Sequence, residues 1–125
     1  MKIYKKTSNR GVRQTEPRVR FQFANNKVIF NRIAMDKMGL YKDQGIYVGT
    51  ENQRLYIVIP SSQEPAGTFT LRSNNRHLEF SSCDMISKVM FDMEWAKNGK
   101  PSMLLDVGDP EAFAEGVKYR LTPIK

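Results

Sequence analysis

The residues best suited to covalent chemistry are Cys83 and His77. Cys83 begins a segment with helical periodicity, and the N-terminus of a helix lowers the pKa of a thiol. A thiolate would need a neighbouring base, and the sequence contains a single histidine. His77 falls on a strand-like stretch beside Arg76 and Glu79, where a surface or cross-strand role is expected. We therefore expect Cys83 to be a small buried residue, and we expect no catalytic residue.

Four acidic side chains, Asp106, Asp109, Glu111 and Glu115, lie close together in the sequence. Carboxylate oxygens can bind a hard cation, but this spacing matches no calcium loop. One cysteine and one histidine also leave no multi-cysteine zinc site. We expect a solvated acidic loop that could contact a basic segment of a neighbouring subunit. No metal and no cofactor are expected.

The basic side chains are concentrated at the start of the chain. The 125 residues carry 20 lysines and arginines against 13 acidic residues, a net charge of +7. Residues 1–20 hold seven of the basic side chains and a single acidic one, Glu16. Few large apolar residues accompany them, which predicts a flexible basic arm over residues 1–17. The candidate binding residues of this arm are Lys5, Lys6, Arg10 and Arg13.

A basic arm suits a polyanionic partner, because each neutralised phosphate releases condensed counterions. The alternative interpretation is a solubilising tail. The mean hydropathy is −0.53, and no apolar run approaches the roughly 20 residues of a membrane span. The basic start is not followed by the apolar core of a secretory signal. We expect a cytoplasmic protein without membrane contact.

The rest of the chain contains a weak internal repeat. Phe21–Asn31 resembles Phe69–Ser81, since both contain a phenylalanine, two asparagines, a basic residue and an apolar run. Further on, Tyr56–Pro60 resembles Tyr119–Pro123 in the same order. The repeat predicts one duplicated domain over residues 18–125. Its two units cover about residues 18–60 and 68–123.

Each unit is predicted to contain two strands, a helix and two further strands. The pairs Asn25-Asn26 and Asn74-Asn75 can adopt positive φ, which favours tight hairpin turns. Asn31 can cap the first helix, and Ser81 or Ser82 can cap the second. In the first unit, strands are expected at 21–23, 27–30, 45–50 and 54–59, and the helix at 32–39. In the second unit, strands are expected at 68–72, 77–80, 102–107 and 116–122, the helix at 83–96, and a long connection at 108–115.

Neither unit could bury much apolar surface alone. Two units packed face to face can close a small barrel. The predicted fold class is therefore α+β: mainly β with two short helices, arranged as a small closed barrel from a duplicated ββαββ unit.

The first unit resembles the AbrB-like family of swapped-hairpin DNA-binding proteins. The resemblance is carried by Val28–Asn31, by the helix that Gly39 ends, by Gly39–Gly49 and by Arg54–Pro60. The family forms its barrel from two chains with interleaved hairpins. The resemblance implies that a chain with both halves makes the equivalent pseudo-dimer.

The resemblance also implies a DNA-binding surface near the first hairpin, rich in arginine and lysine. The two-fold relation would bring the basic hairpins of both units to one side of the barrel. The candidate residues are Arg18, Arg20, Lys27 and Arg32 in the first unit, and Arg72 and Arg76 in the second. Each of them could instead be a solubilising residue that protects an outer sheet surface.

These observations predict a non-enzymatic nucleic-acid-binding protein, with duplex DNA as the expected partner and transcriptional regulation as a role. The alternative is a protein–protein interaction or assembly module without nucleic-acid binding, in which the second helix or a sheet edge binds another chain. A homo-oligomer is compatible with both interpretations.

Overall fold

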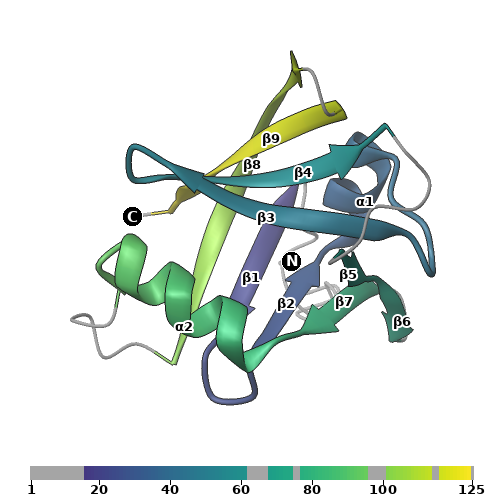
Figure 1. Cartoon of the computed structure of the whole chain (residues 1–125). Coiled ribbons are helices and arrows are strands. Elements are labelled where there is room, and N and C mark those ends of the chain that lie inside the picture. The colour runs from purple at the N-terminus through teal and green to yellow at the C-terminus, as the bar shows by residue number, and fades with distance from the viewer. Residues whose placement is uncertain (1–15, 62–67, 75–76, 96–100, 114–115, 125) are drawn as a thin grey trace, which may run out of the picture.

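The computed structural model describes residues 16–61, 68–74, 77–95, 101–113 and 116–124. They form a mainly β structure with two helices (Figure 1). The first elements are β1 (Arg18–Gln22), β2 (Lys27–Phe30), α1 (Arg32–Met38), β3 (Gly45–Glu51) and β4 (Arg54–Pro60). The remaining elements are β5 (Phe69–Thr70), β6 (Arg72–Asn74), β7 (His77–Ser81), α2 (Cys83–Asp92), β8 (Ser102–Phe113) and β9 (Gly116–Pro123).

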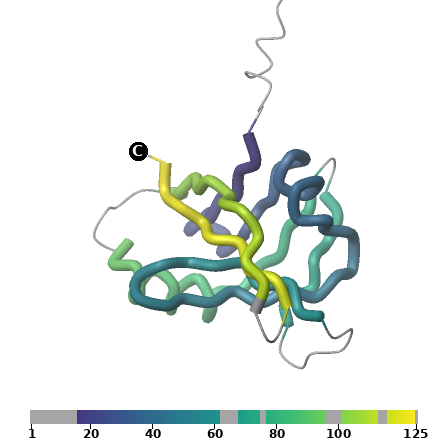
Figure 2. The backbone as a smooth tube through the Cα atoms, turned by 90° about the horizontal axis from the view of Figure 1, so that it is seen from above, coloured from purple at the N-terminus to yellow at the C-terminus, as the bar shows by residue number. Residues whose placement is uncertain are grey.

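All strands belong to one antiparallel sheet in the order β5-β3-β4-β9-β8-β1-β2-β7-β6. Its two outermost strands, β5 and β6, follow one another in the chain and are separated only by Leu71. The Leu71 N–H donates to the carbonyl of Gln44 at 2.9 Å, and its carbonyl accepts from the N–H of Asp43 at 2.8 Å. This run therefore joins both edges, and the sheet forms a nearly closed barrel (Figure 2).

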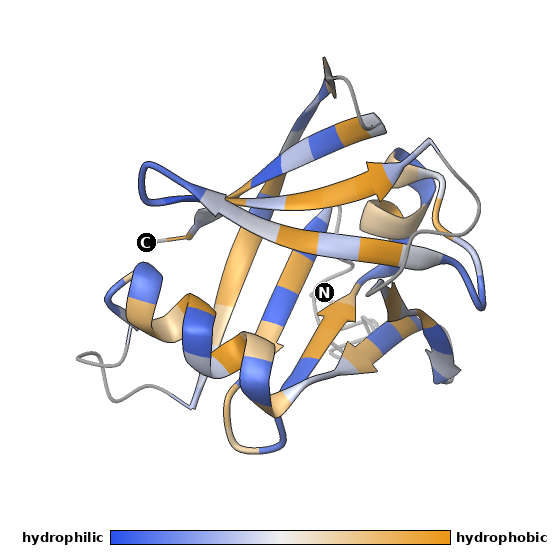
Figure 3. Ribbon diagram, in the orientation of Figure 1, coloured by the Kyte–Doolittle hydropathy of each residue, from blue (hydrophilic) through white to orange (hydrophobic). Residues whose placement is uncertain are grey.

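Alternate residues of the strands fill the barrel, and the apolar colouring of Figure 3 follows them. The ring of Trp95 meets that of Phe21 edge-on, with centroids 5.5 Å apart. Burial of each large apolar side chain contributes roughly 1.5–3 kcal/mol to folding. The largest fully buried side chains are Phe21, Phe30, Ile46, Leu55, Ile57, Leu71, Ile86, Leu105 and Leu121.

The predicted helix starts are confirmed. The Asn31 side chain accepts from the N–H of Ala34, and the Ser82 side chain accepts from the N–H of Met85. Gly39 ends α1 in the left-handed conformation, with a φ of 66°. The second helix is shorter than predicted, because the chain turns after Asp92 and Trp95 enters the core.

The long connection predicted at 108–115 is wrong for residues 108–113, which continue strand β8. A bulge between Val107 and Pro110 shifts the register, and beyond it Glu111 pairs with Lys118. A bulge lets a strand accommodate a proline, which cannot donate to the ladder. The loop-like composition of Gly108-Asp109-Pro110 concealed this strand.

The β4–β9 register also corrects one part of the predicted repeat. Ile57 lies opposite Tyr119, and directly opposed residues share a face of the sheet. Tyr56, the neighbour of Ile57, therefore lies on the other face from Tyr119. Tyr56 and Tyr119, which the predicted repeat aligns, therefore do not occupy equivalent positions in the sheet.

Gly116 begins β9 with a φ of 148°, and a Cβ built on it would lie 2.9 Å from Pro60 Cα. We expect Gly116→Ala to lower the free energy of unfolding by roughly 2 kcal/mol or more, because backbone must move. Gly49→Ala is the control, since its Cβ would meet nothing closer than Val58 Cγ2 at 4.0 Å. Urea denaturation measures both, and equal stability of the two variants would contradict the close approach at Gly116.

Candidate nucleic-acid interface

One face of the sheet collects most of the described candidate residues. We call the surface of β8, β1, β2, β7 and β6 that faces away from the core the outer face. One row of opposed residues crosses all five strands, since each lies directly across from the next. In order, the row is Leu104, Arg20, Ile29, Glu79 and Arg72.

Strand β1 places Arg18 and Arg20 on the outer face, on either side of the buried Val19. The Arg18 guanidinium forms an ion pair with Asp106, which lies opposite on β8. The Arg20 side chain donates to the Ser102 hydroxyl at 3.2 Å. Both arginines are thus held against β8, and only Arg18 has a carboxylate partner.

Lys27 and its surroundings form a polar cluster around Glu79. Lys27 Nζ lies 3.2 Å from Glu79 Oε2, and His77 Nε2 lies 3.5 Å from Glu79 Oε1. The Asn74 side-chain amide donates to the same carboxylate. Glu79 is buried, although it belongs to the outer face. The cluster places a satisfied negative charge at the centre of the predicted cationic surface.

The pKa of Glu79 lies below its ordinary value of 4.5. Burial by itself raises the pKa, but the hydrogen bonds from Asn74 and Lys27 and the charges of Lys27 and His77 outweigh that effect. The carboxylate therefore adds stability above pH 4.5, and this contribution is lost as the pH falls through the lower pKa of the folded state.

The remaining candidates are divided. Arg72 is exposed on the outer face, in the row opposite Glu79. Arg32 lies on α1, off the outer face, 3.7 Å from its helical neighbour Asp36. The candidates Lys5, Lys6, Arg10, Arg13 and Arg76 lie outside the described residues.

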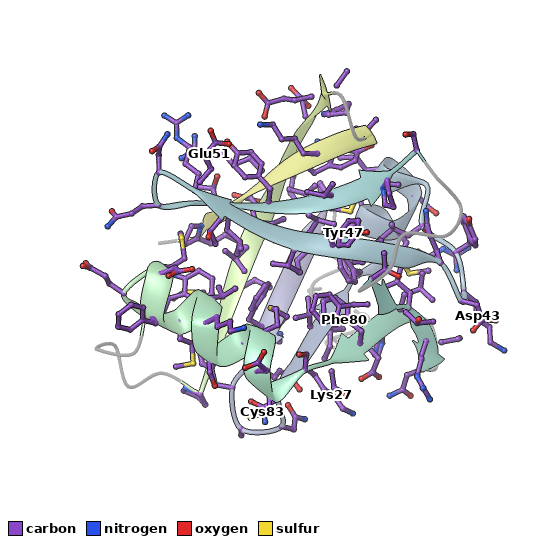
Figure 4. All side chains as sticks on the ribbon, in the orientation of Figure 1. Lys27, Asp43, Tyr47, Glu51, Phe80 and Cys83 are labelled. Carbon is purple, nitrogen blue, oxygen red and sulfur yellow. The ribbon has the colours of Figure 1, made fainter. Side chains whose placement is uncertain are left out.

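The two basic hairpins share the outer face, because β1, β2, β7 and β6 are neighbours in the sheet, but the expectation that their turns lie side by side is wrong. Strands β2 and β7 run antiparallel, with Lys27 opposite Ser81 and Phe30 opposite Leu78. The β1–β2 hairpin therefore ends beside the start of α2, where Lys27 and Cys83 lie close in Figure 4. His77, at the end of the β6–β7 hairpin, lies beyond Leu78 at the opposite end. At about 3.3 Å per residue, the two ends are roughly 13–17 Å apart.

The part of the chain that the structure describes is electrically balanced. It holds 11 of the 20 lysines and arginines and 11 of the 13 acidic residues. Several cations are paired with carboxylates, as Lys37 is with Asp109 at 3.4 Å. The net charge of +7 therefore comes from the residues that the structure does not describe, chiefly residues 1–15.

The sequence patterns did not predict the carboxylates that pair with the basic candidate residues. Asp106 and Asp109, assigned to a solvated loop, instead contact Arg18 and Lys37 from strand β8. The alternation of β7 could have placed Glu79 beside His77 on one face, but it gave no sign that the carboxylate would be buried.

Cys83 and His77 do not form a nucleophile–base pair. His77 begins β7 and Cys83 lies just beyond the end of that strand. At about 3.3 Å per residue, the strand separates them by roughly 15–20 Å. Cys83 is exposed, so the expectation that it is buried is wrong.

Comparison with protein-family models, with curated proteins and with solved structures finds no match to this chain. Within the described segments, neither helix has the length and apolar character needed to cross a bilayer.

Removal of Lys27 tests the Glu79 cluster. We expect Lys27→Met to raise the pKa of Glu79 and to lower the free energy of unfolding at pH 7 by roughly 1 kcal/mol. The loss should shrink as the pH falls through the lowered pKa of Glu79 in the folded state, because protonation then removes the ion pair from the parent protein as well. Lys88→Met is the control, because its partner Asp84 is exposed. Denaturation over a series of pH values below 7 measures the effect, and a pH-independent loss would contradict it.

Proposed function

We propose that the chain is a non-enzymatic nucleic-acid-binding protein that binds duplex DNA in the cytoplasm and acts in transcriptional regulation. The observation that carries this proposal is the continuity between the basic residues 1–20 and strand β1. That strand presents Arg18 and Arg20 on the outer face. A DNA strand whose phosphates bind the first residues of the chain could therefore also contact these two arginines.

The charge distribution assigns most of the binding free energy to residues 1–20. Among the described residues, Arg18 and Lys27 already have carboxylate partners, so a phosphate must compete for them. Within the described part of the chain, Arg20 and Arg72 have no carboxylate partner, and they would extend the phosphate contacts across the outer face. Counterion release from the phosphates then drives association and makes it depend steeply on salt.

We further propose that the barrel is a duplicated, AbrB-like pseudo-dimer. Two features support this. The order β1-β2-α1-β3-β4 recurs when the run 69–74, which is β5 and β6 separated by Leu71, is taken as the first strand of a second half that continues with β7-α2-β8-β9, and the strands in corresponding positions pair with one another. Thus β2 pairs with β7, and β4 pairs with β9. The first strand of each half also pairs with the third strand of the other, as β1 does with β8 and β5 with β3. Interleaved hairpins require pairing of this kind.

The alternative function is self-assembly without nucleic acid. It is favoured by Phe91, whose ring on α2 is 82% exposed. A large exposed apolar side chain is typical of an interface when others surround it. Size-exclusion chromatography with light scattering separates the two functions. A dimer that Phe91→Ser dissociates, in a protein that binds no DNA, would favour assembly.

Neutralisation of the basic segment tests the DNA-binding proposal. The test variant combines Lys5→Gln, Lys6→Gln, Arg10→Gln and Arg13→Gln. Fluorescence anisotropy with a labelled duplex should show weaker binding, and the slope of log K against log salt should fall by up to about 3.6, or 0.9 per phosphate contact.

The control variant removes the same charge from exposed positions outside β1 and β2. It combines Lys42→Gln, Arg54→Gln, Lys88→Gln and Arg120→Gln. The control should change the slope much less than the test variant. Equal slopes for the two variants would show that net charge alone governs binding, and no measurable binding by the parent chain would refute the function.

A further inference from the structure

A groove lies between helix α2 and strand β3, on a different part of the barrel from the outer face. It has a volume of about 350 Å³ and is partly open to solvent. Figure 4 shows Tyr47 on β3 above it, with Cys83 at the start of α2 on the opposite side. The groove is lined by Tyr47, Val48, Thr50, Phe69, Asp84, Met85, Lys88, Val89 and Asp92.

One wall of the groove is an incompletely paired edge of the sheet. Strand β3 pairs with β4 from Tyr47 to Glu51, whereas on its other side it pairs with β5 only at Gly45 and Ile46. Past Ile46, no described strand pairs with that edge. The corresponding side of β8 is filled by β1 over five residue pairs, Arg18–Gln22. The groove borders this edge at Val48 and Thr50, where the described strands leave it without a partner strand.

The floor of the groove is apolar. Val48 and Phe69 are partly buried and pack against the barrel core. Met85 and Val89, on the inward side of α2, complete the floor. A strand laid along β3 would direct alternate side chains onto this surface.

The rim of the groove is acidic. Asp84 and Asp92 lie about two turns apart on α2, with Lys88 between them. Lys88 Nζ is 3.1 Å from Asp84, and Asp92 accepts from the Thr50 hydroxyl at 3.3 Å. Glu51, which follows Thr50 at the end of β3, lies 3.9 Å from Lys118 Nζ, so the charges that line the groove are the two carboxylates of α2 and the single Lys88.

We propose that this groove binds an extended peptide of a partner protein by adding a strand to the open edge of β3. The peptide would alternate apolar side chains, which contact the floor, with lysine or arginine, which face Asp84 and Asp92. A second copy of this chain is a poorer occupant, because its own β3 edge would bring a second acidic rim against the first. The site does not depend on nucleic-acid binding.

The test uses the full chain and a fluorescent octapeptide that alternates lysine and valine. Anisotropy should show saturable binding. A glutamate–valine octapeptide should bind at least tenfold more weakly, because its charges repel the rim. A lysine–valine peptide with alternate amides N-methylated should also bind at least tenfold more weakly, because it cannot donate to β3. Equal affinity of all three peptides, or no saturable binding of the first, would overturn the proposal.

Variants locate the binding on the protein. Asp84→Lys combined with Asp92→Lys should lower the affinity for the lysine–valine peptide at least tenfold. Asp36→Lys combined with Asp109→Lys is the matched control, since these carboxylates are also exposed and lie away from the groove. An equal loss of affinity in both variants would show that only the net charge of the protein matters, and it would overturn the proposal.

Hydrogen exchange tests the added strand itself. Saturation with the lysine–valine peptide should slow amide exchange in Val48–Glu51. Binding without this protection would overturn strand addition. A second copy of the chain would be the occupant if the protein stays dimeric at saturating peptide and if the same amides are already protected before peptide is added. That result would also overturn the proposal. The variant with four neutralised basic residues in 1–15 should bind the peptide as the parent does, whether or not DNA binding is lost.

Discussion

The antiparallel pairing of β2 with β7 is the constraint on which the outer face depends. It places Ile29 directly opposite Glu79 and brings the carboxylate within 3.2 Å of Lys27. A buried carboxylate is tolerated only when it is paired and hydrogen-bonded, which Lys27, Asn74 and His77 achieve together. Lys27, one of the side chains that make the face look cationic in the sequence, is thereby used to neutralise a buried negative charge.

This pairing also determines how cations are distributed over the protein. Because the two strands run in opposite directions, the β1–β2 and β6–β7 hairpins point to opposite ends of the pair. The described residues hold equal numbers of acidic and basic side chains, so the net positive charge of the chain does not come from them. The proposed binding of a polyanion therefore depends on residues 1–20, including Arg18 and Arg20 of β1. In that proposal, the barrel positions these arginines and adds a small number of contacts.

Local features of this fold were predictable from the sequence, and long-range ones were not. Asn31, Gly39 and Ser82 mark helix boundaries through hydrogen bonds to residues three or four positions away, and such signals are legible in a single chain. The ion pair of Arg18 with Asp106 joins residues 88 positions apart, so no local pattern announces it. For the same reason, the sequence indicated the cations of the candidate site but not the carboxylates that neutralise them. Strand β8 was cut short in the prediction because the bulge that accommodates Pro110 is a property of its pairing with β9.

The open edge of β3 is a consequence of how the barrel closes. The run 69–74 must pair with β3 at one end and with β7 at the other, and Leu71 between them is held by the backbone of Asp43 and Gln44. Because the run is so short, only two of its residues pair with β3 and three pair with β7. Strand β1 is not divided in this way, and all five of its residues pair with β8. Among the described residues, closure with so short a segment thus leaves one edge of β3 without a partner strand beside an apolar floor, and the acidic residues of α2 would favour a basic segment there.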